Sequence, residues 1–108
     1  ENDAVKKSAQ GKELDSQARL NIALCKLTTK DYDTAIDQCE RVLDNEPSNW
    51  KAAFRMANAM YQKNGEFKNS LQGIRTVHNY AKKAHQGNPN DKKVKELYDQ
   101  VRAKFEES

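Results

Sequence analysis

The chain has 108 residues, enough for one small domain and too few for two independent hydrophobic cores. Hydrophobic residues make up 36% and charged residues 32%, and there are only 4 glycines and 2 prolines, a composition that favours amphipathic helices over strands joined by turns. No apolar run approaches the roughly 20 residues that span a bilayer, and residues 1–20 contain no signal-peptide core, so we expect a cytoplasmic protein without a membrane span.

The net charge of +3 is unevenly distributed along the chain. Residues 1–50 carry a charge of −3 and residues 51–108 a charge of +6, so an acidic partner should be attracted to the second half. Much of the positive charge lies between Lys82 and Lys95, where no Phe, Tyr or Trp is interleaved with the basic residues. Solvated surface explains this run more simply than a nucleic-acid site does, and no nucleic-acid partner is expected.

The first two helices are expected over about residues 12–29 and 32–45. In the first, three- and four-residue spacing places on one helix face, the predicted buried stripe, the residues Leu14, Ala18, Asn21, Ile22 and Cys25. Residues 1–11 are polar and are expected to be a linker or the end of a preceding helix. The side chain at position 31 is an aspartate, which can accept backbone N–H groups where the second helix begins. The second helix is expected to end before the proline at position 47, because proline is not tolerated in a helix interior.

Three further helices are expected in the second half of the chain. The third spans about residues 49–63 and is capped by Ser48 or Asn49, and the fourth spans about residues 67–86 after an Asn-Gly turn. The stretch 87–90, Gly-Asn-Pro-Asn, ends the fourth helix, and residues 90–108 are expected to form a C-terminal capping helix. Because short connections make neighbouring helices antiparallel, the sequence predicts an all-α stack of helix pairs.

Two segments of the chain overlay at a spacing of about 34 residues. The stretch 21–23, Asn-Ile-Ala, falls on residues 55–57, Arg-Met-Ala, and Tyr32 falls on Phe67 once one residue is inserted near Gly65. Here the chain resembles the tetratricopeptide-repeat (TPR) family, whose period is about 34 residues. The resemblance implies an α-solenoid of about two units over residues 12–89, with small residues where helices cross, at Ala23, Ala35 and Ala57. Two units are fewer than the usual three, which suggests the later part of a longer array.

Residues 51–55, Lys-Ala-Ala-Phe-Arg, resemble the third-repeat segment of tetratricopeptide modules that bind the acidic carboxyl-terminal tails of heat-shock chaperones. Such modules hold the tail with a carboxylate clamp of five positions. The resemblance places Asn21 at the middle position and Lys51 and Arg55 at the last two, and it places the first two upstream of Glu1. Residues 21–25 with 35–39 look most like the tail domain of FKBP-type immunophilins, which follows a peptidyl-prolyl isomerase domain.

The chemistry of these residues agrees with a carboxylate site. Lys51 and Arg55 are one helical turn apart and leave the same face, and each charge-assisted hydrogen bond is worth about 1.5–3 kcal/mol before desolvation. Asn21 can both donate and accept hydrogen bonds, so it can orient a peptide backbone. Further contacts on the same side are predicted from Phe54, Asn58, Tyr61 and Gln62. The function expected is that of a co-chaperone interaction module that binds the Glu-Glu-Val-Asp tail of a ninety- or seventy-kilodalton heat-shock chaperone.

Plainer alternatives stay open for the same residues. A lysine and an arginine on one helix face are usually solvated surface, and a generic scaffold repeat without chaperone-tail binding is the alternative function. The amphipathic last helix, residues 94–105, could dock onto calmodulin, although capping of the stack is its simpler use.

Nothing in the sequence points to catalysis by this chain. Cys25 and Cys39 are expected to be small buried core residues, and the two cysteines and two histidines lack the compact spacing of a metal site. No phosphate-binding loop or nucleophile motif is present. We therefore expect no cofactor, no metal and no enzymatic activity of the chain itself.

Overall fold

A computed structural model describes residues 12–63 and 70–107, and these residues form five α-helices and no strand. The helices are α2 (Lys12–Thr28), α3 (Tyr32–Asn45), α4 (Trp50–Gln62), α5 (Leu71–Gly87) and α6 (Lys92–Glu107). The prediction of an all-α fold is confirmed. The expected linker, residues 1–11, and the expected start of the fourth helix, residues 67–69, lie outside the described residues.

Local signals set the ends of the helices. Asp31, Asn49 and Ser70 each accept the backbone N–H three residues ahead, at 3.3, 3.1 and 2.9 Å, and so satisfy donors that the first turn leaves open. After α2, Lys30 adopts a left-handed backbone with φ of 65°, and the N–H of Asp31 donates to the carbonyl of Lys26 at 2.8 Å. That bond is characteristic of the Schellman motif, which terminates a helix sharply.

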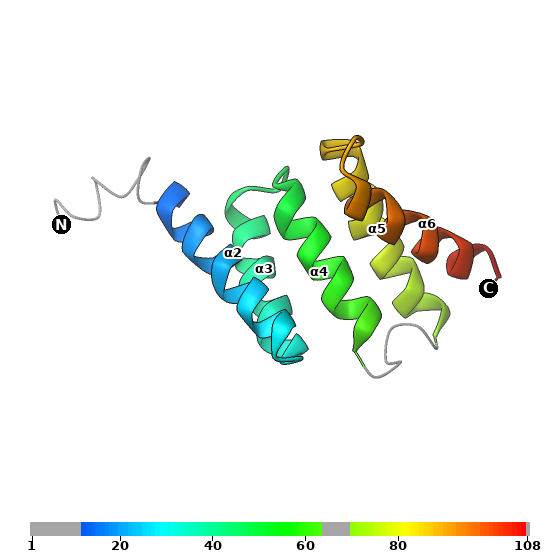
Figure 1. The fold of residues 1–108 in the computed structure, drawn as a ribbon, viewed down its shortest axis with the longest axis horizontal. Coiled ribbons are helices and arrows are strands. Elements are labelled where there is room, and N and C mark those ends of the chain that lie inside the picture. Colours follow the sequence, from blue (N-terminus) through cyan, green and yellow to red (C-terminus); the bar gives the residue numbers. More distant parts are fainter. Residues whose placement is uncertain (1–11, 64–69, 108) are drawn as a thin grey trace, which may run out of the picture.

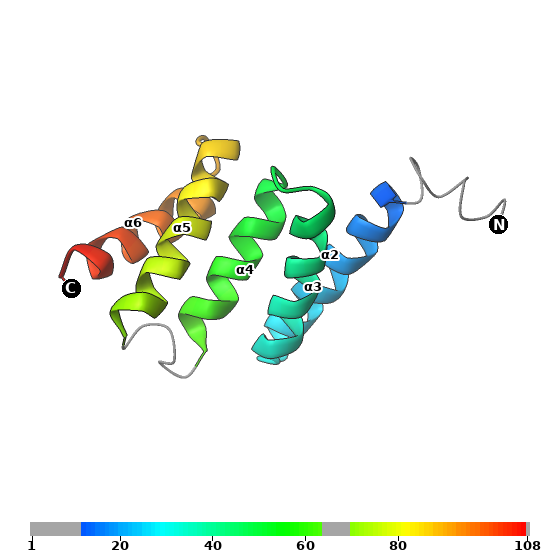
Figure 2. The same cartoon turned by 180° about the vertical axis from the view of Figure 1, so that it is seen from behind.

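The helices stack side by side in chain order, and consecutive helices run antiparallel (Figure 1). α2 and α6 lie in front of α3 and α5 in Figure 1, and the view from behind shows α3 and α5 in front (Figure 2). Besides its contacts with consecutive neighbours, α4 contacts both α2 and α6. The inner layer is therefore formed by α2, α4 and α6, which is the arrangement of a helical solenoid.

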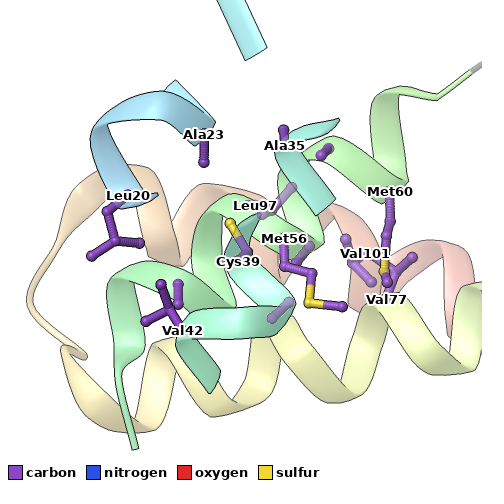
Figure 3. Packing of buried hydrophobic residues seen from close by; sticks show 14 of the residues in the cluster. Leu20, Ala23, Ala35, Cys39, Val42, Met56, Met60, Val77, Leu97 and Val101 are labelled. Carbon is purple, nitrogen blue, oxygen red and sulfur yellow. The ribbon is translucent and has the colours of Figure 1, made fainter. Parts of the chain in front are cut away.

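Small residues allow the helices to approach one another closely. Ala23, Ala35 and Ala57 have no exposed surface, as the repeat pattern predicts. Larger side chains from all five helices fill the space around them and form the main core cluster (Figure 3). The largest fully buried members of this cluster include Val42, Met56, Ile74, Val77 and Val101. Interiors are close-packed, so a larger side chain at any of the three alanines would push the helices apart.

The stripe of α2 that the sequence pattern predicted to be buried is exposed. Its described apolar members are Ala18, Ile22 and Cys25, and the polar member Asn21 is exposed as well. The positions 34 residues later are Ala52, Met56 and Ala59, and all three are buried. The difference has a physical cause: α2 and α3 cover this side of α4, whereas none of the described helices covers the corresponding side of α2. The expectation that Cys25 is a core residue is therefore wrong, whereas Cys39 is buried in the core as expected.

The last helix, α6, buries its apolar face against the stack. Val94, Leu97 and Val101 are buried, and Phe105 stacks on His78 of α5 with 4.6 Å between ring centroids. The surface that docking onto calmodulin would require is thus already in contact with the rest of the domain.

Candidate peptide-binding groove

A groove of about 370 Å³ lies where α2, α4 and the start of α6 meet. The face of α4 forms its floor through Lys51, Phe54, Arg55 and Asn58, which are spaced by three or four residues and therefore share one side of the helix. These are four of the seven residues that the sequence predicted for peptide binding. The groove thus joins two cations, one aromatic ring and one amide on a single helix face.

Arg55 is held in place by a hydrogen bond to the backbone of α2. Its Nη1 donates to the carbonyl oxygen of Leu20 at 2.7 Å, and the side chain is half-buried. A guanidinium has five N–H donors, so this bond leaves others to bind a carboxylate. Fixing the arginine before a ligand arrives reduces the side-chain entropy that binding would otherwise cost. Arg55 is therefore partly preorganised for anion binding.

Lys51 is the more exposed of the two cations. Its Nζ lies 5.9 Å from the centroid of the Trp50 ring, at the outer limit of a cation–π contact. Trp50 also lines the groove and packs beside the small cluster formed by Ala53, Ala84 and Val94. The lysine therefore keeps a hydrated ammonium group at the rim, while the aromatic ring adds apolar surface next to it.

Three of the predicted site residues do not line this groove. Asn21 is exposed on α2, although it follows Leu20, whose carbonyl binds Arg55. Tyr61 is partly buried against the core. Gln62 is exposed and acts on a groove residue indirectly, because its Nε2 donates to Oδ1 of Asn58 at 2.5 Å. Gln62 therefore contributes to the orientation of the Asn58 amide.

Five lining residues were missed by the sequence analysis. Leu24 and Leu27 of α2 form an apolar wall opposite α4, and Trp50, Asp91 and Lys93 complete the groove. Leu24 lies three residues after Asn21, so helical spacing counted from that asparagine was a usable signal. No comparable signal existed for Asp91 and Lys93, because their position depends on how α6 crosses α4.

The charges around the groove are mostly positive. Lys51, Arg55 and Lys93 supply three cations, and Asp91 supplies the single carboxylate among the lining residues. Oδ1 of Asp91 accepts the backbone N–H of Val94 at 3.1 Å, so this carboxylate caps the first turn of α6. The groove is consequently suited to an anionic ligand with apolar parts.

Within residues 12–63 and 70–107, no group of three or more His, Cys, Asp or Glu side chains is arranged to hold a metal ion. None of the described helices combines the length and apolarity needed to cross a membrane.

The antiparallel helix pairs and the 34-residue correspondence define a TPR-like helical domain with a groove along its inner layer. No protein-family model matches the sequence. Among known proteins, the chain is similar to FK506-binding protein 5 of Rhizopus delemar, with 36% identity over 66 residues. That match covers 61% of this chain and 17% of the relative, so the chain corresponds to a small part of the relative's length.

Proposed function

We propose that this chain is the peptide-binding part of an immunophilin-type co-chaperone and holds the acidic carboxyl-terminal tail of a ninety- or seventy-kilodalton heat-shock chaperone. The observation that carries the proposal is that Lys51 and Arg55 line one groove, opposite the apolar wall formed by Leu24 and Leu27. A tail that ends in aspartate presents two carboxylates, one from the side chain and one from the chain end. Two neighbouring cations suit this pair, because charge-assisted hydrogen bonds are about twice as strong as neutral ones.

The remaining predicted residues have subordinate roles in this proposal. Phe54 and Asn58 contact the tail further from its end, and Gln62 positions Asn58 through their hydrogen bond. Asn21 lies outside the groove on α2, so in this proposal it contacts only a part of the peptide that extends beyond the groove, and Tyr61 supports α4 by packing against the core. The proposal therefore separates direct contacts, made mainly by α4, from residues that hold α4 in place.

The similarity to FK506-binding protein 5 supports the immunophilin part of the proposal. Catalysis would then belong to a peptidyl-prolyl isomerase domain elsewhere in a longer parent protein, with this chain as its docking arm. A cytoplasmic location belongs to the same proposal and agrees with Cys25 and Cys39, which are both free thiols.

Titration with the peptide Met-Glu-Glu-Val-Asp, followed by amide chemical shifts in NMR spectra, tests the proposal. A micromolar complex corresponds to about 8 kcal/mol, and a clamp lacking its first two positions should lose about 2–4 kcal/mol of that, so we expect a Kd of about 30 µM to 1 mM. Arg55→Ala should weaken binding at least about tenfold, because it removes a bond of about 1.5–3 kcal/mol. Arg75→Ala, which removes the same charge from the exposed surface of α5, is the matched control.

The alternative is a generic scaffold that takes peptides through the apolar wall without recognising a chain end. A peptide with the last four residues scrambled, and a peptide with an amidated carboxyl terminus, separate the two functions. The chaperone-tail proposal requires both changes to weaken binding as strongly as Arg55→Ala does. Equal binding of the native and scrambled peptides, with Arg55→Ala behaving like Arg75→Ala, would establish the scaffold function instead.

A further inference from the structure

The wall of the groove that faces α4 is partly built by the first turn of α6. Asp91 and Lys93 both line the groove there, together with the α4 residues Lys51 and Arg55. The cations that line the groove therefore come from two helices, Lys51 and Arg55 from α4 and Lys93 from α6. A ligand that carries more than one anionic group can pair with cations of both helices.

The position of Lys93 is determined by the cap of α6. Asp91 accepts the N–H of Val94 at 3.1 Å, and Val94 is buried with 1% exposure between the neighbouring helices. Because the residues on both sides of Lys93 are constrained, its Cα is fixed relative to α4 while its long side chain is exposed. Among the described residues, Lys93 has no ion-pair partner. Its ammonium group is thus available to a ligand in the groove.

The groove has apolar surface as well as cations. Leu24 and Leu27 of α2 and the ring of Phe54 of α4 are the lining residues that supply it. An extended peptide places successive side chains on opposite faces, so it can direct an apolar side chain at this surface and acidic side chains toward cations. The composition of the groove therefore suits an extended peptide that carries both acidic and apolar residues.

We propose that Lys93 is a specificity-determining residue of this groove. Lys93 binds an acidic side chain of the peptide, upstream of the terminal carboxylates held by Lys51 and Arg55. The inference rests on the proposed function and adds a requirement for acidity within the peptide, not only at its end. Asp91 opposes this selection, because its carboxylate caps α6 and at the same time repels an acidic ligand.

The test compares charge-matched variants on one helix. Lys93→Gln should weaken binding of Met-Glu-Glu-Val-Asp by about two- to fivefold, the range of a solvent-exposed ion pair. Lys95→Gln removes the same charge from an exposed position of α6 that does not line the groove, and it should change the Kd by less than about 1.5-fold. Asp91→Asn keeps a side-chain oxygen for the cap and removes the repulsion, so it should strengthen binding by a similar two- to fivefold factor.

A double-mutant cycle with the peptide identifies the partner of Lys93. Replacing both internal glutamates by glutamine should weaken binding to the wild-type chain and should have little effect on binding to the Lys93→Gln chain. Thermal unfolding of each variant verifies that the exposed substitutions leave the fold intact.

Two results would overturn the inference, and they are distinguishable. If Arg55→Ala weakens binding but Lys93→Gln and Lys95→Gln behave alike, the role of Lys93 is refuted and the proposed function stands. If Arg55→Ala has no effect, the proposed function is refuted together with the role of Lys93.

Discussion

Replacing Gly87 with alanine should destabilise this domain, although alanine is the better helix former. Gly87 is the last residue of α5 and lies against the first residue of α4. A Cβ added at Gly87 would lie 2.5 Å from Cβ of Trp50 and 3.6 Å from its Cα. Carbon atoms in contact are normally about 3.5–4.0 Å apart, so one of the two helix ends has to shift.

The size of the effect follows from two opposing contributions. Overpacking costs about 1–3 kcal/mol, and the upper part of this range applies because the clash involves a Cβ next to the backbone and not the end of a flexible side chain. Replacing a helical glycine by alanine stabilises the helix by about 1 kcal/mol. The net loss should therefore be about 1–2 kcal/mol, which corresponds to a fall in Tm of roughly 5–15 °C for a domain of this size.

Urea unfolding followed by circular dichroism measures this loss. Gln86→Ala, at the exposed neighbouring position, is the control and should stay within about 0.5 kcal/mol of the parent. Because Trp50→Ala retains the Cβ that causes the clash, the penalty of Gly87→Ala should persist in that background. A Gly87→Ala chain as stable as the parent would refute the close approach of α4 and α5.

Three further predictions concern stability and side-chain chemistry. Lys30→Gly should raise the free energy of unfolding by about 0.5–1 kcal/mol, because glycine adopts the left-handed φ of 65° without strain; a decrease would contradict that backbone conformation. Burial raises the pKa of the Cys39 thiol to about 12, so a thiol reagent at pH 8 should label exposed Cys25 in the folded chain and Cys39 only after unfolding; similar labelling rates would argue against the core packing. Burial, together with the positive charge of Lys82, lowers the pKa of the His78 imidazole in the folded chain. As the pH falls below about 6.5, this imidazole is therefore protonated in the unfolded chain before it is protonated in the folded chain. The free energy of unfolding should then decrease from pH 7 toward pH 5.5, with a shallower slope in His78→Gln; an unchanged slope would exclude His78 as the cause.

The helices and the paired cations of α4 could be predicted because their signals are local. Asp31 and Asn49 cap helices through N–H groups only three residues away, and the same geometry operates in any tertiary context. Likewise, the one-turn spacing of Lys51 and Arg55 places both on one face wherever α4 is packed.

The burial of each helix face could not be predicted from its own residues. Ile22 and Met56 occupy equivalent positions of the repeat, yet Ile22 is 42% exposed and Met56 is 2% exposed. The sequence pattern around them is similar, but α2 and α3 pack on one side of α4, and no described helix packs on the corresponding side of α2. Neighbouring helices, and not local periodicity, decided which apolar stripe joined the core.

The groove, likewise, is determined partly by local sequence and partly by the packing of helices. By itself, the sequence determined that α4 carries a lysine and an arginine on one face, since that depends on residues within a single turn. Only the tertiary structure decided that Leu24 and Leu27 face them from α2, and that Asp91 and Lys93 face them from the start of α6. Those residues are brought together by the angles at which α2 and α6 cross α4, and crossing angles depend on how the side chains of all the helices pack together.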